Sequence, residues 1–168
     1  VANRIGGGGW GWRIGMATAG FEGGLMLRSP ARFQKTAENL VALYRQNQQT
    51  ADADPAIKDA VLKSWMQAEA YTLATYNTAS RLAKGGHIGA EASTNKIFWS
   101  ELDRSMNRTA MQLMGAAAEL AKFADGTVNQ WLDGYIFSLS GPIYAGSNEI
   151  QRNITAERLL GLPRQGAG

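Results

Sequence analysis

The sequence predicts an all-α fold, an antiparallel four-helix bundle with a short C-terminal helix. Three observations support this class. Apolar residues recur every three or four positions over long segments, glycine and proline separate those segments, and little of the chain has the alternation of a β-strand. Amphipathic helices of this kind bury their apolar faces against one another. We assign residues 10–164 to this bundle, 1–9 to a linker from preceding domains, and 165–168 to a tail.

The first helical segment follows the glycine-rich linker at 1–9. Four successive glycines cannot hold a regular element, and no strand fits before them, so a phosphate-binding loop is not expected. From Trp10 to Leu25 the apolar residues have helical spacing, and Pro30 kinks or restarts the helix. The apolar positions then resume at Phe33, Ala37, Leu40 and Tyr44.

Two longer helices follow a polar loop at 46–54. Asp54 is the expected N-cap with Pro55 at the first helical position, and Gly85 and Gly86 end this second helix. Its predicted buried stripe is Ile57, Val61, Trp65, Ala68, Thr72, Tyr76 and Ala79. The stripe of the third helix is Phe98, Leu102, Met106, Ala110, Leu113, Ala117 and Leu120. We interpret the tryptophans Trp65, Trp99 and Trp131 as packing residues.

Two shorter helices complete the predicted bundle. Asp125 and Gly126 form a turn, and a helix covers about 128–139 before Gly141 and Pro142 break it. Ser147 then caps a last helix that runs to about Leu160.

The composition excludes several functional classes. There is no cysteine and His87 is the only histidine, so zinc sites, di-iron sites with Glu-x-x-His pairs and thiol chemistry are not expected. The net charge of +3 is scattered, which argues against a nucleic-acid surface. No apolar run is long enough for a membrane span, and a cytoplasmic setting is the default expectation. Spacing alone gives a helical bundle without a self-contained catalytic site.

Three segments resemble acyl-CoA dehydrogenases. Residues 143–154, Ile-Tyr-Ala-Gly-Ser-Asn-Glu-Ile-Gln-Arg-Asn-Ile, together with 156–164, resemble the C-terminal signature of that family. Residues 11–18 and the following Phe21-Glu22 resemble the opening helix of its C-terminal domain, and 112–115 its Gln-x-x-Gly-Gly flavin contact. The resemblance covers essentially the whole chain. It implies FAD as cofactor and α,β-dehydrogenation of an acyl-CoA thioester, and that two N-terminal segments of the family are missing here.

The resemblance places the catalytic base on the opening helix. Most members have a glutamate directly after the signature tyrosine, and this position is Ala145 here, which cannot accept a proton. Some members instead place the glutamate on the opening helix, which corresponds to Glu22; the alternative is a solvated surface glutamate. Glu149 is the second acid near the signature. A favourable interaction with a helix N-terminus explains it better than a role as base.

The resemblance also implies cofactor and substrate contacts. Ser147 and Glu149 correspond to contacts with the adenosine part of the flavin. Gln112 and Gly115 correspond to contacts with the pyrophosphate of a flavin held mainly by a neighbouring subunit, although Ala116 replaces the second glycine of that motif. Arg45 stands in for an Arg-x-x-Phe-Gly motif whose Phe-Gly is absent. The residues expected at the substrate are Tyr144, Ala145 and Gly146.

The implied partners are an acyl-CoA substrate, a second copy of the chain or a related subunit in a dimer or tetramer, and an electron-transfer flavoprotein as acceptor. Two alternatives stay open. Ala145 and the missing Phe-Gly also fit a non-catalytic partner subunit of a heteromeric acyl-CoA dehydrogenase. A helical oligomerisation module that descends from the family would bind neither flavin nor acyl-CoA.

Overall fold

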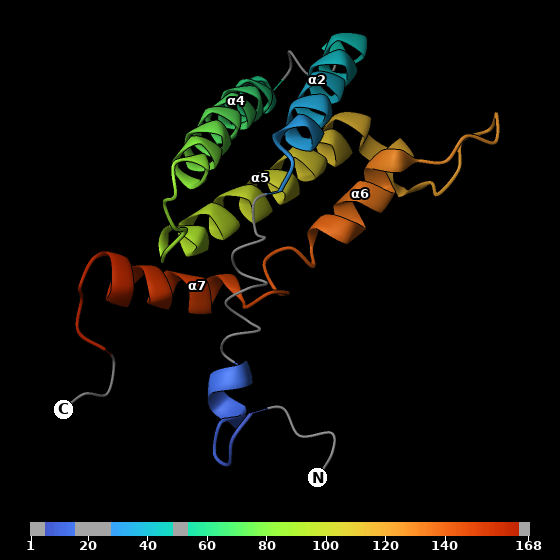
Figure 1. Cartoon of the computed structure of the whole chain (residues 1–168). Helices are drawn as coiled ribbons and strands as arrows, with labels where there is room; N and C mark the ends of the chain where they lie inside the picture. The colour runs from blue at the N-terminus through green and yellow to red at the C-terminus, as the bar shows by residue number, and fades with distance from the viewer. Residues whose placement is uncertain (1–5, 16–27, 49–53, 165–168) are drawn as a thin grey trace.

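The computed structural model describes residues 6–15, 28–48 and 54–164, and this part of the chain is helical (Figure 1). The all-α class is therefore confirmed. The only β-pairing among the described residues is an isolated bridge between Lys122 and Val128. No helix in the described ranges has the length and apolar character needed to cross a bilayer. The elements are α2 (Pro30–Gln46), α4 (Pro55–Ala83), α5 (Glu91–Met114), a 3-10 turn η1 (Gly115–Glu119), α6 (Gln130–Ser138), α7 (Asn148–Ile154) and a π-turn η2 (Thr155–Leu159).

Three long helices form the centre of the molecule, with α2 and α4 antiparallel to each other and both packed on α5 (Figure 1). The shorter α6 runs back along α5, and α7 crosses near the beginning of α5. Residues 11–15 form a helical turn, whereas 16–27 lie outside the described residues. The count of four bundle helices therefore stays a prediction.

Most helix boundaries follow local signals in the sequence. The Asp54 carboxylate accepts a hydrogen bond from the Ala56 N–H at 2.9 Å, and α4 ends before Gly85, whose φ is +81°. Ser147 caps α7 as predicted. The third helix was expected to continue through Leu120, which is wrong. Gly115 leaves the helical conformation with φ +55° and ψ −133°, and Leu120 is 51% exposed.

The core lies where α2, α4 and α5 meet. It consists of Phe33, Ala37, Leu40, Val61, Ala68, Tyr71, Trp99, Leu102, Met106, Ala110 and Leu113.

The aromatic residues expected in the core are buried to different extents. Trp99 is buried and Trp131 packs against the core, as expected, but Trp65 is 47% exposed and Tyr76 is 61% exposed. Because α4 contacts α2 and α5 at once, its buried face passes through Ser64, Tyr71 and Thr75 instead. The predicted stripe on α4 was therefore partly wrong.

Candidate functional site

The first residues of the C-terminal signature, 143–147, lie in a tight turn between α6 and α7, which we call the signature turn. The N–H of Asn148 donates to the Pro142 carbonyl at 2.8 Å, and the Gln151 side-chain amide donates to the Ala145 carbonyl at 3.0 Å. Ala145 and Gly146 both have positive φ, at +54° and +84°. These bonds fix the backbone at the three residues predicted to meet the substrate.

A buried lysine from α5 supports this turn. Lys96 is completely buried, and its Nζ donates to Asn148 Oδ1 at 2.7 Å. The Asn148 amide in turn donates to Glu101 Oε1 at 2.9 Å and bonds to Ser100. Desolvation lowers the pKa of Lys96, while the charges of Glu149 and Glu101 partly oppose this change. This network ties the first turn of α7 to α5, and sequence analysis missed it because no local pattern marks Lys96.

An arginine and two aromatic rings, one of them Tyr144 of the turn, contact one another. Arg28 Nη2 donates to Tyr144 Oη at 2.9 Å. The Arg28 guanidinium carbon lies 5.0 Å from the Trp99 ring centroid and 5.6 Å from that of Tyr144. The two rings are themselves 6.0 Å apart. Sequence analysis missed Arg28 as well, because 116 positions separate it from Tyr144.

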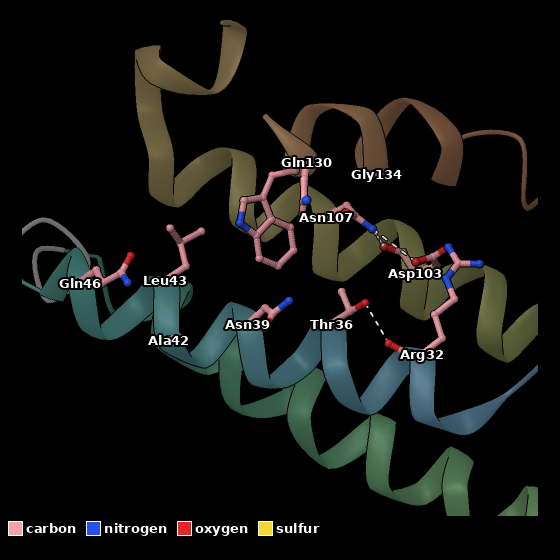
Figure 2. Close-up of a pocket in the computed structure, with 11 residues that line it drawn as sticks. Arg32, Thr36, Asn39, Ala42, Leu43, Gln46, Asp103, Asn107, Gln130 and Gly134 are labelled. Atoms are coloured by element: carbon pink, nitrogen blue, oxygen red, sulfur yellow. Dashed lines mark hydrogen bonds and ion pairs between the residues drawn. The ribbon is translucent and has the colours of Figure 1, made fainter. Parts of the chain in front are cut away.

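The predicted pyrophosphate contacts lie at the opposite end of α5. Because α2 and α5 run parallel, with Arg32 beside Asp103, the last turn of α2 and the last turn of α5 lie at the same end (Figure 2). Arg45, Gln112 and Gly115 are all exposed there. About 20 Å of helix separates Trp99 from Gln112, at ~1.5 Å per residue. The structure therefore divides the predicted cofactor residues into two groups.

A polar groove of about 360 Å³ lies between α2, α5 and α6 (Figure 2). Arg32 forms an ion pair of 2.7 Å with the buried Asp103, and Asn107 donates to the Asp103 carbonyl at 2.8 Å. Burial raises the pKa of Asp103, and the charges of Arg32 and Arg28 oppose this. No residue predicted for the site lines this groove, and the described residues include no group of three acidic or histidine side chains placed to hold a metal ion.

The chain matches proteins of known family along almost its whole length. Residues 9–160 match the family model for "Acyl-CoA dehydrogenase, C-terminal domain". The chain belongs to the acyl-CoA dehydrogenase family. It is 35% identical over 165 residues to "Acyl-CoA dehydrogenase IpdE1" of Mycobacterium tuberculosis and 35% identical over 162 residues to the protein of the same name in Mycolicibacterium smegmatis. The matches cover 98% and 94% of this chain but only 41% and 38% of those relatives.

Solved structures share the fold of this acyl-CoA dehydrogenase domain. A variant of the Tcur3481-Tcur3483 steroid ACAD aligns with a TM-score of 0.72 at 22% identity, covering 92% of this chain and 41% of that one. The ChsE4-ChsE5 complex from Mycobacterium tuberculosis aligns with a TM-score of 0.58 at 25% identity, covering 83% of this chain and 37% of that one.

The acids of this acyl-CoA dehydrogenase domain differ in their suitability as base. Glu149 is exposed, and hydrogen bonds from its own backbone N–H and from the Ser147 hydroxyl lower its pKa. A base that removes an α-proton needs a raised pKa, and the pKa of Glu149 is lowered. Its environment therefore fits a residue that stabilises a helix N-terminus and does not fit a base. Ala145 is exposed and offers no carboxylate. Glu22 lies outside the described residues, and its role stays a prediction.

The residues present fit a flavin that is held from outside the bundle. Gly115 has no atom within 4 Å of the position a Cβ would take, so its backbone is open to a close neighbour. Exposed Arg45 supplies a positive charge at the same end, as a pyrophosphate requires. Ser147 and Glu149 lie at the other end of α5, beside the signature turn. The predicted flavin contacts therefore lie at two edges of the helical bundle and not in one enclosed cavity.

Proposed function

We propose that this chain is the helical domain of a flavin-dependent acyl-CoA dehydrogenase that oxidises the α,β-bond of an acyl-CoA thioester. The observation that supports this most is the supported signature turn, in a chain whose family model matches residues 9–160. Tyr144, Ala145 and Gly146 would contact the acyl group from this turn. The acyl group would come from a fatty acid or a sterol side chain, and the electron acceptor would be an electron-transfer flavoprotein.

In the proposed reaction a carboxylate removes the proton next to the thioester carbonyl, and the β-hydrogen leaves as hydride. The flavin, when bound, supplies the hydride acceptor. We assign the removal of this proton to Glu22, because Ala145 has no carboxylate to accept it and the environment of Glu149 lowers the pKa of that residue. Ser147 and Glu149 would hold the adenosine part of FAD. Arg45, Gln112 and Gly115 would contact the pyrophosphate of a second FAD from a neighbouring subunit.

We further propose that a second helical subunit of this family covers the outer face of α4. Leu62, Met66, Leu73 and Tyr76 lie on one side of this helix and are between 52% and 70% exposed. Apolar rows of this kind on a surface helix are typical of interfaces. The separation of the predicted flavin contacts into two ends of α5 also supports a neighbouring subunit. The solved relatives whose titles name two different chains support a related subunit as this partner.

A non-catalytic partner subunit is the second candidate, and Ala145 is the observation that favours it. In that case a complex with a catalytic chain would contain fewer flavins than subunits. One flavin for each copy of this chain in a homo-oligomer would contradict this alternative.

The substitution Glu22→Gln tests the proposed base in the complete flavin-loaded protein or complex that contains this chain. It removes the proton acceptor with almost no change in volume, so we expect flavin to stay bound while turnover falls by a factor of 10³ or more (on the order of a lost general base plus its positioning). Glu38→Gln on the exposed face of α2 is the matched control and should keep full turnover. Unchanged turnover of the Glu22 variant would remove this residue from the mechanism.

A further inference from the structure

The guanidinium of Arg28 lies beside the signature turn and forms no ion pair with a carboxylate of the described residues. Its side chain lies against Trp99 and donates to the Tyr144 hydroxyl at 2.9 Å. The Tyr71 hydroxyl donates to the Arg28 carbonyl at 3.0 Å, which fixes the backbone from which the side chain extends. The ion pairs between described residues do not include Arg28. Its charge acts on the buried Asp103, which is ion-paired with Arg32, but the direct contacts of the half-buried guanidinium are with the rings of Trp99 and Tyr144 and the Tyr144 hydroxyl.

Among the described residues, the cluster of Arg28, Trp99 and Tyr144 has more hydrogen-bond donors than acceptors. A guanidinium carries five N–H groups, and the bond to Tyr144 uses one of them. Because the Tyr144 oxygen accepts that bond, its own hydrogen is available for a different acceptor. The Trp99 indole N–H is buried and has no partner among the described residues. A ligand that completes this cluster must bring an acceptor oxygen.

We propose that Arg28 and Tyr144 form a subsite for a carbonyl or carboxylate oxygen on the acyl group of the substrate. This inference rests on the proposed function, because that function places the acyl group at Tyr144. A hydrocarbon acyl group would displace water from these donors without replacing its hydrogen bonds, and such a mismatch is what makes a polar site selective. An oxygenated acyl group would instead accept hydrogen bonds from these donors. The subsite therefore selects oxygenated acyl thioesters over plain fatty ones.

Equilibrium binding to the complete flavin-loaded protein that contains this chain tests the subsite. Three thioesters share one chain length: octanoyl-CoA, its derivative with a ketone near the far end, and its counterpart with a carboxylate at the far end. Calorimetry should show that at least one oxygenated thioester binds about tenfold or more tightly than octanoyl-CoA, as a hydrogen bond to a charged group predicts. The derivative that binds more tightly than octanoyl-CoA shows whether the subsite takes a ketone or a carboxylate oxygen.

Two variants connect this preference to the cluster. Arg28→Met removes the charge at similar length, and Tyr144→Phe removes a single oxygen, so the second variant keeps the test informative if the first one unfolds. Each should bring the ratio of dissociation constants close to one. Arg108→Met, on an exposed part of α5, should leave the ratio unchanged.

Three results would overturn the subsite: equal affinity for the three thioesters, no binding of any of them, or a preference that persists in both variants. Failure of the proposed function gives a different result, namely binding without reduction of the flavin.

Discussion

Ala145 and Gly146 both have positive φ but differ in what a methyl group costs there. Both φ values lie in the left-handed region, and at Gly146 an added Cβ would press on the Gln151 amide that holds the Ala145 carbonyl. We expect Gly146→Ala to lower the free energy of unfolding by about 1–2 kcal/mol, the usual cost of that conformation for an L-residue. Ala145→Gly removes the same strain and should be neutral or slightly stabilising. Urea unfolding of the two variants measures this difference, and equal losses would contradict it.

Lys96 gives the stability of the domain a dependence on alkaline pH. Burial lowers its pKa below 10.5 in the folded chain. Between that lowered pKa and 10.5, the unfolded chain binds more protons than the folded one, so stability rises with pH in this interval. Lys96→Met lacks this contribution. Unfolding at a series of pH values should therefore show the wild type gaining relative to the variant as pH approaches 10.5, and a constant difference would refute the burial of a charged lysine.

Individual residues were predictable where the signal is local. Ser147 and Asp54 cap helices within three positions of themselves, so the chain near them is enough to identify them. Lys96 and Arg28 act on residues 52 and 116 positions away. Their roles depend on the packing of α7 and of the signature turn, which no local pattern contains.

The N-cap of α4 should contribute measurably to stability. The Asp54 carboxylate satisfies the Ala56 N–H at the start of the longest helix described. Asp54→Ala should lower the free energy of unfolding by about 1 kcal/mol, the usual value for an N-cap. Asp59→Ala removes an exposed acid one turn further along the same helix and should cost less. Equal effects of the two variants in thermal unfolding would show that the cap bond contributes nothing.

The extent of each helix was easier to predict than its buried face. Glycine, proline and caps fixed the ends of α4 and the start of α7, whereas the 3-10 turn after Gly115 ended α5 earlier than its apolar spacing indicated. The buried face of α4 depends on its contacts with both α2 and α5. Apolar spacing alone cannot distinguish a residue such as Trp65 at the edge of that contact from Tyr71 at its centre.

At the scale of the whole molecule, the outer face of α4 should decide the subunit number. The double substitution Met66→Lys and Leu73→Lys adds two charges to the exposed apolar row, and their desolvation would oppose a neighbouring subunit. Light scattering of the complete protein should show a lower molar mass for this variant. Ser105→Lys, at an exposed position of α5, is the control and should keep the wild-type mass. Unchanged mass in the double variant would exclude this face as the interface.

The order of segments and the family resemblance were visible in the sequence, but the division of the site was not. Tyr144 and Gln112 are 32 positions apart along the chain. The course of the helices is seen in Figure 1. Tyr144 packs against Trp99 in the first half of α5, whereas Gln112 lies in the last turn of that helix, so the two groups of predicted contacts are far apart. Under the proposed function, that arrangement places flavin contacts on two edges of the domain, which is why we propose a neighbouring subunit.

The most direct test of the account is anaerobic mixing of the complete flavin-loaded protein with an acyl-CoA thioester, followed by the visible absorption of the flavin. We expect the wild type to lose this absorption as hydride is transferred, and the Glu22→Gln variant to keep it although it binds the thioester. Loss of absorption at the same rate in both proteins would contradict Glu22 as the base. A wild type that binds acyl-CoA and leaves its flavin oxidised would contradict the dehydrogenase itself.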